Sequence, residues 1–277
     1  MRARLCPVLR FWTMLELFLK VAREACVLGG LVLKDYFGKL DPSQIKTKGE
    51  KDVFCIADSK SEECIIEHIK KHFPDHSVVA EEGGGEIKSE YVWYIDPLDG
   101  TKNFITGLPI FAVSIGLLKM DEPLVGAVYL PFYDSLYWAI KNQGAFKDGK
   151  RLKVSSRSPI SRCSVVYGFP SRARRDVNMY LKIIREIFAR VGSVRRLGAA
   201  SVDLCLVAEG VFDGFIEFEL RPWDVAAGVL ISSEAGAKVW LPEGFSSSLD
   251  LCVGSELCFE FIKSVMQERF EIPGWKK

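Results

Sequence analysis

Histidine is scarce in this chain, which has three among 277 residues: His68, His72 and His76. All three lie in one segment with the period of an amphipathic helix and its exit loop. A zinc site or a catalytic triad built on histidine is therefore poorly supplied. We expect the three imidazoles to be solvated surface groups.

An excess of charge is also absent, because 37 Lys and Arg face 36 Asp and Glu, for a net charge of +1. Nucleic-acid binding normally needs a basic excess or stripe, so we expect a small-molecule partner and no nucleic acid. The eight cysteines form no Cys-x-x-Cys pair and most lie in apolar runs, which favours reduced thiols in a cytoplasmic protein. No apolar run reaches membrane-spanning length, so we expect no membrane partner.

What the chain does have is the composition of a globular α/β (α+β) protein, with 48% hydrophobic and 26% charged residues. Helical periodicity begins at Leu15, so we interpret residues 1–13 as an extension upstream of a true start at Met14. The Ser- and Arg-rich stretch 154–161, which includes Pro159, is the best domain boundary. It predicts a metal-binding lobe over 14–155 and a second lobe, carrying Asp224, over 156–277. Helices layered on sheets are the expected arrangement.

The most informative stretch follows the apolar run 92–95, which ends at Asp96-Pro97 and then Asp99-Gly100. Such a run predicts a buried strand, and the two dipeptides predict the turn that ends it. Two carboxylates at the end of a dry strand repel each other and resist desolvation unless a cation lies between them. A turn and nothing more remains the alternative.

Three further acids lie where a strand ends or a helix begins: Asp58, Glu81 and Asp224. Taken singly, Asp224 fits a helix N-cap and Glu81 fits an ordinary loop acid. Taken together with Asp96 and Asp99, they match the carboxylate oxygens that Mg²⁺ prefers when it serves phosphate substrates. Three consecutive glycines follow Glu81-Glu82, so we expect this loop to be unusually free.

The chain resembles the inositol monophosphatase family in two motifs, DPLDGTKNF at residues 96–104 and WDVAAG at residues 223–228. Shorter matches extend the resemblance from about Leu15 to the final helix. The resemblance implies a layered αβαβα sandwich of the inositol monophosphatase / fructose-1,6-bisphosphatase type. It also implies a magnesium-dependent, lithium-sensitive phosphomonoester hydrolase that forms a homodimer.

Roles carried over from the family apply position by position. The implied ligands of a first Mg²⁺ are Glu81, Asp96, the Leu98 carbonyl and Thr101. The implied ligands of a second are Asp96, Asp99 and Asp224, and a third, weaker ion would lie at Glu81. The implied catalytic residues are Asp58, Thr101 and Glu81, with Thr101 and Asp58 orienting the attacking water and no covalent phosphoenzyme. The implied phosphate and substrate contacts are Asp99, Gly100, Thr101, Gly198, Ala200, Glu217 and Asp224.

The motifs indicate the reaction but not the alcohol that leaves. Inositol-1-phosphate is the expected substrate. The alternatives are fructose-1,6-bisphosphate, either alone or as a second substrate, and adenosine 3′,5′-bisphosphate. The basic cluster of Arg172, Arg174, Arg175, Arg195 and Arg196 is either a solvated face or the source of an arginine that binds a second phosphate or a sugar hydroxyl. A non-catalytic module that binds RNA-processing or transcription machinery is disfavoured, because every implied metal ligand is present and the chain has no large excess of basic residues.

Overall fold

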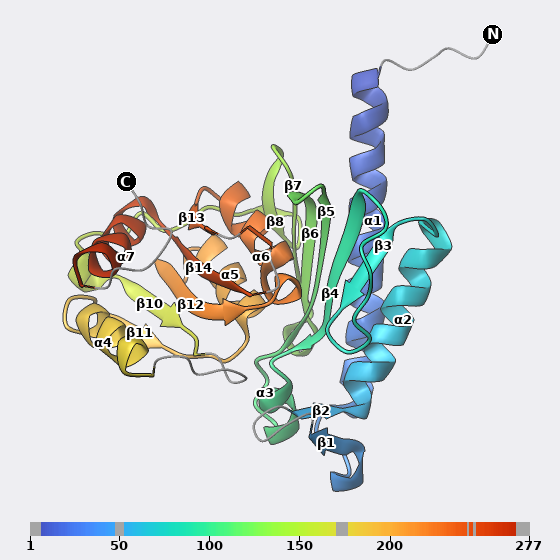
Figure 1. The fold of residues 1–277 in the computed structure, drawn as a ribbon, viewed down its shortest axis with the longest axis horizontal. Coiled ribbons are helices and arrows are strands. Elements are labelled where there is room, and N and C mark those ends of the chain that lie inside the picture. Colours follow the sequence, from blue (N-terminus) through green and yellow to red (C-terminus); the bar gives the residue numbers. More distant parts are fainter. Residues whose placement is uncertain (1–6, 48–52, 170–176, 243, 246–247, 270–277) are drawn as a thin grey trace.

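The computed structural model describes residues 7–47, 53–169, 177–242, 244–245 and 248–269. Five layers follow one another across the molecule (Figure 1). Helices α1 (Pro7–Tyr36) and α2 (Ile56–His72) cover a seven-stranded sheet, and α5 (Ala200–Ala208) and α6 (Pro222–Glu234) cover its other face. A five-stranded sheet comes next, and α4 (Val177–Phe188) and α7 (Glu256–Arg269) cover its outer face. The predicted αβαβα sandwich is confirmed.

The seven-stranded sheet has the order β3-β4-β5-β6-β7-β8-β9, and every pair is antiparallel except the parallel pair β3 and β4. Its strands are β3 (Ser77–Ala80), β4 (Tyr91–Asp99), β5 (Ala112–Lys119), β6 (Glu122–Leu130), β7 (Ser135–Ile140), β8 (Gly144–Lys147) and β9 (Lys150–Arg151). Because helices cover both faces, β4 to β6 are apolar runs rather than alternating ones. A Cβ added at Gly116 would lie 2.7 Å from the Ala226 Cβ, so glycine lets α6 lie close to the sheet.

The five-stranded sheet has the order β11-β10-β12-β14-β13, with β10 parallel to both of its neighbours. Its strands are β10 (Ser164–Tyr167), β11 (Ser193–Arg195), β12 (Gly214–Leu220), β13 (Lys238–Trp240) and β14 (Leu249–Gly254). Two short elements complete the fold near the cavity described below, the pair β1 (Ile45–Thr47) and β2 (Val53–Cys55) and the helix α3 (Thr101–Thr106).

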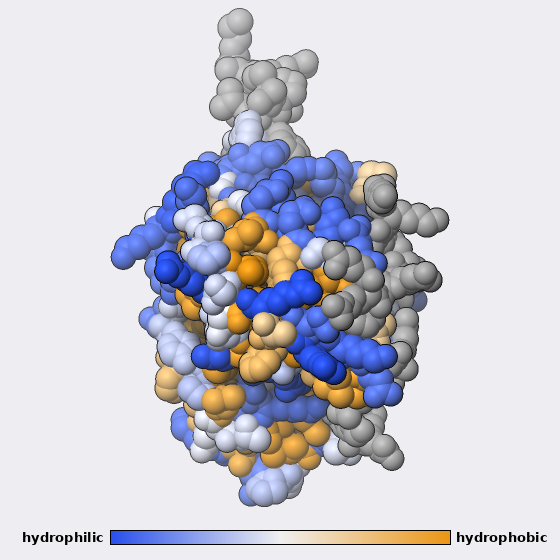
Figure 2. Space-filling view, turned by 90° about the vertical axis from the view of Figure 1, so that its left-hand side faces the viewer, coloured by the Kyte–Doolittle hydropathy of each residue, from blue (hydrophilic) through white to orange (hydrophobic). Residues whose placement is uncertain are grey.

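Apolar clusters fill each of the four spaces between the layers, and two of them share the space between the first sheet and the α5 and α6 layer. Alternation along the strands of the smaller sheet assigns side chains to opposite faces, so Phe215 packs toward α5 and α6 while Ile216 packs toward α4 and α7. Figure 2 shows the outer face on the α4 and α7 side, where apolar side chains gather among polar ones. Leu181, Phe188 and Leu257 are exposed apolar residues of these two helices.

Several element boundaries differ from the pattern in the sequence. Helix α1 begins at Pro7, earlier than the periodicity that starts at Leu15, and β4 continues through Pro97 to Asp99. The periodicity of the sequence did not predict β14. This segment forms a strand by pairing with β12 on one side and with β13 on the other. The predicted boundary after residue 155 falls between the two sheets, and the division into two lobes stays a prediction.

The histidines differ from one another. His76 lies between the rings of Phe73 and Tyr91, with both centroid distances 4.8 Å, and its Nδ1 accepts a hydrogen bond from Trp93 Nε1 at 3.0 Å. The expectation of a solvated imidazole is therefore wrong for His76, because the helix exit folds back onto β4. The seven cysteines in the described part of the chain are free thiols. No helix among the described residues is both long enough and apolar enough to cross a bilayer.

Candidate active site

The end of β4 is bent so that both of its carboxylates face one cavity. The register against β5 shifts between Asp96 and Asp99, which is the geometry of a bulge. Asp96 Oδ1 accepts a hydrogen bond from Leu98 N at 3.0 Å, and Ser61 Oγ of α2 donates to the Pro97 carbonyl at 3.0 Å. The Asp-Pro-Leu-Asp sequence thus forms a braced strand end, and both acids line the cavity.

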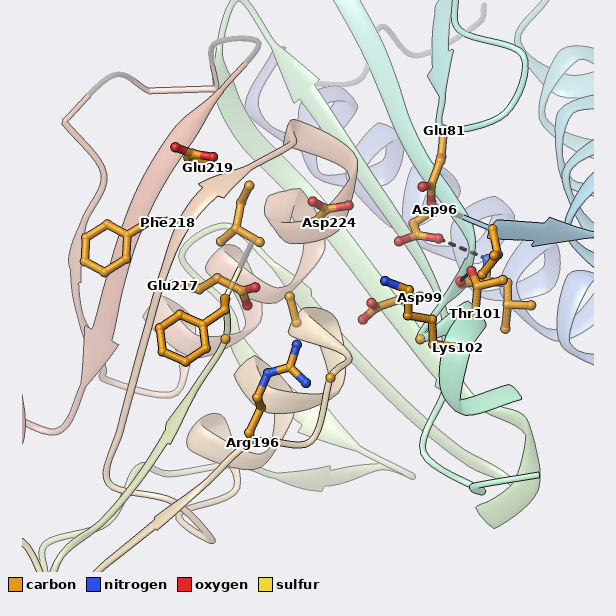
Figure 3. Close-up of a pocket in the computed structure, with 18 residues that line it drawn as sticks. Glu81, Asp96, Asp99, Thr101, Lys102, Arg196, Glu217, Phe218, Glu219 and Asp224 are labelled. Atoms are coloured by element: carbon orange, nitrogen blue, oxygen red, sulfur yellow. Dashed lines mark hydrogen bonds between the residues drawn. The ribbon is translucent and has the colours of Figure 1, made fainter. Parts of the chain in front are cut away.

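Glu81, Asp96 and Asp224 converge on one point from three elements (Figure 3). Glu81 follows β3, Asp96 belongs to β4 and Asp224 lies in the first turn of α6, and one carboxylate oxygen from each lies within 4.8 Å of the others. Burial raises the pKa of Asp96 well above its ordinary value, and the charges of Glu81, Asp99 and Asp224 raise it further. Three hard oxygen donors that destabilise one another's charge fit a divalent cation such as Mg²⁺.

Asp99 is held by a residue that the sequence did not single out. Ser201, in the first turn of α5, donates to Asp99 Oδ2 from its backbone N at 2.7 Å and from its Oγ at 2.6 Å. Burial raises the pKa of Asp99, while these hydrogen bonds oppose that rise. The two bonds join the first sheet to the helix layer and aim the other oxygen of Asp99 into the cavity. The only local signal for Ser201 is its place after the Gly-Ala-Ala segment at 198–200.

Asp58 lies behind Thr101 rather than in the cavity wall. It occupies the first turn of α2, where its Oδ2 accepts hydrogen bonds from Cys55 N at 2.9 Å and Cys55 Sγ at 2.8 Å. The Thr101 hydroxyl lies 3.2 Å from Asp58 Oδ1 and 3.0 Å from the Leu98 carbonyl oxygen. Burial raises the pKa of Asp58 to about 6, although the Cys55 hydrogen bonds oppose this. A hydroxyl that donates to a carboxylate keeps its lone pairs for a further donor, such as water.

Gly100 makes the turn between β4 and α3 sterically possible. Its φ is 89°, in the left-handed region, and an added Cβ would lie 2.8 Å from the Ile110 carbonyl oxygen. The Asn103 side chain donates to the carbonyls of Ile110 and Leu197, so α3 is tied to the segment that precedes Gly198. This contact brings Gly198 and Ala200 to the cavity together with Gly100 and Thr101.

The far wall of the cavity comes from a bulge in β12 (Figure 3). The register against β14 shifts between Glu217 and Leu220, and Glu219 has a positive φ of 57°. A Cβ added at Gly168 would lie 1.9 Å from the Glu217 carboxylate, so glycine alone leaves room for it. Burial raises the pKa of Glu217 to about 8, the charges of Asp224 and Asp99 add to the rise, and Arg196 lowers it.

The loop that carries Glu81 is more constrained than the glycines predict. Glu62 of α2, which is 6% exposed, accepts hydrogen bonds from Glu82 N at 2.9 Å and from Gly83 N at 2.7 Å. Ala80 and Gly84 exchange two backbone hydrogen bonds of 2.9 and 3.0 Å. The expectation of an unusually free loop is wrong, because a distant carboxylate binds its backbone.

All the residues carried over as ligands or substrate contacts line this cavity: Glu81, Asp96, Leu98, Asp99, Gly100, Thr101, Gly198, Ala200, Glu217 and Asp224. Lys102, Phe169 and Arg196 line it as well, and of these three only Arg196, as part of the basic cluster, was a candidate from the sequence. Of the arginines in the basic cluster, Arg172, Arg174 and Arg175 lie outside the described residues. Arg195 and Arg196 are both exposed, but Arg195 donates to its neighbour's carbonyl, Val194 O, at 2.9 Å, and Arg196 is the one that lines the cavity.

The fold is a five-layer α/β sandwich, and its acidic cavity holds carboxylates placed so that they could bind a metal ion. The model described as the inositol monophosphatase family matches residues 14–268, and the chain belongs to that family of phosphatases. A fructose-1,6-bisphosphatase/inositol-1-monophosphatase from Aquifex aeolicus is 53% identical over 260 residues, which cover 93% of this chain and 98% of that protein.

A putative Nus factor SuhB from Neisseria meningitidis serogroup B is 39% identical over 237 residues, which cover 82% of this chain and 91% of that protein. Among solved structures, the extragenic suppressor protein suhB from Bartonella henselae superposes with a TM-score of 0.84 at 33% identity. The superposition covers 91% of this chain and 98% of that one. These names differ, so the similarity extends to the family and its fold, not to one substrate.

Proposed function

We propose that this chain is a magnesium-dependent phosphomonoester hydrolase that releases inorganic phosphate from inositol-1-phosphate. The observation that carries the proposal is the convergence of the Glu81, Asp96 and Asp224 carboxylates beside Asp99 and Thr101. This donor set is made entirely of hard oxygens, which suits Mg²⁺, and Mg²⁺ usually serves phosphate substrates.

In this proposal Glu81, Asp96, the Leu98 carbonyl and Thr101 would hold one ion, and Asp96, Asp99 and Asp224 would hold another. When bound, such ions neutralise the phosphate and stabilise an in-line displacement. Thr101 accepts a hydrogen bond from the attacking water and donates its own proton toward Asp58 Oδ1, 3.2 Å away. The backbone N–H groups of Gly100 and Thr101 bind the phosphate. Glu217, with Gly198 and Ala200, contacts the hydroxyls of the leaving polyol.

A second candidate substrate, fructose-1,6-bisphosphate, is favoured by Arg196. Its guanidinium lies in the cavity wall on the Glu217 side, across from Asp99 and Thr101 (Figure 3). Among the residues that the structure describes, Arg196 makes no salt bridge, and a guanidinium binds a phosphate through paired hydrogen bonds. The name of the relative from Aquifex aeolicus includes both substrates.

Phosphate release from inositol-1-phosphate, fructose-1,6-bisphosphate and adenosine 3′,5′-bisphosphate, measured with Mg²⁺ as kcat/KM, tests both candidates. Arg196→Gln is the informative variant and Arg195→Gln is its matched control. Loss of one charged hydrogen-bond partner costs about 1.5–3 kcal/mol, so Arg196→Gln should lower kcat/KM for the bisphosphate about 10- to 150-fold. Inositol-1-phosphate should be unaffected by either variant. Absence of Mg²⁺-dependent turnover on all three substrates would overturn the enzymatic proposal.

The remaining expectations are a homodimer, inhibition by Li⁺ and a cytoplasmic location. The free thiols of the described cysteines are typical of a reducing compartment, which supports the last of these. Sedimentation velocity and a lithium titration of the phosphatase reaction test the first two.

A further inference from the structure

A second group of ligand-type side chains lies on the opposite side of the first sheet from α6. His68 and His72 are separated by one helical turn of α2, so both imidazoles lie on the same face of that helix. Their ring centroids are 4.8 Å apart. Glu24 reaches toward them from α1, and one ligand atom from each of the three residues lies within 4.8 Å of the others.

The distances suit a shared ion. His68 Nε2 lies 3.2 Å from Glu24 Oε2. Two ligands of one tetrahedral zinc ion, each about 2.0–2.1 Å from the metal, lie about 3.3 Å apart. The other oxygen of Glu24, Oε1, is 3.9 Å from Lys20 Nζ, so the lysine leaves Oε2 to the imidazole.

His72 already has the outer hydrogen bond that a metal-bound histidine needs. Its Nδ1 lies 2.9 Å from the His68 carbonyl oxygen, and a carbonyl can only accept, so Nδ1 carries the proton. In the neutral ring the lone pair is then on Nε2. A backbone carbonyl that orients the imidazole in this way is the usual second partner of a histidine ligand. His72 lies four residues after His68 on the helix, and this spacing places its ring next to the His68 carbonyl.

We propose that Glu24, His68 and His72 form a binding site for a zinc-class divalent ion between α1 and α2, separate from the acidic cavity. Two imidazoles and one carboxylate select Zn²⁺ or Co²⁺ over Mg²⁺, which prefers oxygen ligands throughout. His72 is exposed, so water completes the tetrahedral coordination from the solvent side. The ion fastens α1 to α2, the helix whose first turns carry Asp58 and Glu62.

Cobalt is the probe that separates the two sites, because tetrahedral Co²⁺ absorbs visible light much more strongly than octahedral Co²⁺. Wild-type protein in saturating Mg²⁺ should bind one equivalent of Co²⁺ with tetrahedral absorption, and Zn²⁺ should displace it. Loss of an outer-shell partner already lowers metal affinity about 10- to 100-fold, so His72→Ala and Glu24→Gln should each weaken binding by more than about 100-fold. Glu67→Gln, an exposed acid on the same helix, is the matched control and should bind as wild type does.

Zn²⁺ should also raise the melting temperature of wild type and of Glu67→Gln, but not of His72→Ala or Glu24→Gln. The Mg²⁺-dependent phosphatase rate should be the same in all four proteins, so this test does not depend on the proposed substrate. Equal Co²⁺ affinity and absorption in wild type, His72→Ala and Glu24→Gln would overturn the site. So would a wild-type protein that takes up no stoichiometric Co²⁺ in saturating Mg²⁺.

Discussion

The loop after β3 presents Glu81 to the acidic cavity, and a carboxylate from another element holds that loop in place. Glu62 accepts hydrogen bonds from Glu82 N at 2.9 Å and Gly83 N at 2.7 Å. An added Cβ at Gly83 would lie 2.8 Å from Glu62 Oε1, so the backbone approaches this carboxylate closely. Replacing Glu62 with alanine should therefore weaken Mg²⁺ binding without removing any proposed ligand.

The size of the effect follows from the two bonds. A hydrogen bond to a charged group contributes about 1.5–3 kcal/mol, and both bonds are only partly buried, so water replaces part of what they supply. A net loss of about 1.4–2.7 kcal/mol lowers the equilibrium constant between the held and the released loop about 10- to 100-fold. The Mg²⁺ concentration for half-maximal rate should rise by up to this factor.

The assay is phosphate release from inositol-1-phosphate as a function of Mg²⁺ concentration, compared among wild type, Glu62→Ala and Glu63→Ala. Glu63 is the neighbouring residue on α2 and is exposed, so its replacement should leave the Mg²⁺ dependence unchanged. Saturating Mg²⁺ should restore most of kcat in Glu62→Ala, because every proposed ligand remains. An unchanged half-saturating Mg²⁺ concentration, or a loss of kcat that Mg²⁺ does not restore, would refute the positioning role.

Three further predictions concern the site and the fold. Asp99→Asn should abolish turnover, which a phosphate-release assay checks. Its melting temperature should stay that of wild type, which a thermal melt checks, because asparagine keeps an oxygen that accepts the hydrogen bonds from Ser201. Burial lowers the pKa of His76 below its ordinary 6.5, so the unfolded chain binds the proton first. Urea unfolding of wild type and His76→Phe at a series of pH values isolates this contribution, because the buried acids Asp58 and Glu217, whose pKa values are raised, affect both proteins alike. Wild type should lose stability relative to His76→Phe as the pH drops from 6.5 toward the lowered pKa, and a constant difference would contradict the prediction. Gly116→Ala should cost about 1–3 kcal/mol of unfolding free energy by pushing α6 from the sheet, and an unchanged urea midpoint would contradict that close contact.

The apolar runs and the acids at their ends were enough to predict the layered fold class and the cluster around Asp96. A strand covered on both faces must be apolar throughout, so a carboxylate at its end stands out in the sequence alone. The extra strand β14 and the exact extent of β4 were not predictable in this way. Both depend on neighbouring strands that supply hydrogen bonds from distant segments.

The sequence by itself predicted the residues around Asp96 that we propose to carry the chemistry, because two acids at the end of an apolar run and the glycine turn after them are local features of one short segment. Only the tertiary structure decided the partners of these residues. Ser201 binds Asp99 from 102 positions away, Glu62 holds the Glu81 loop, and Arg196 rather than Arg195 enters the cavity wall. Each of these contacts joins segments whose approach is set by the packing of whole layers, and no local pattern in the chain records that packing.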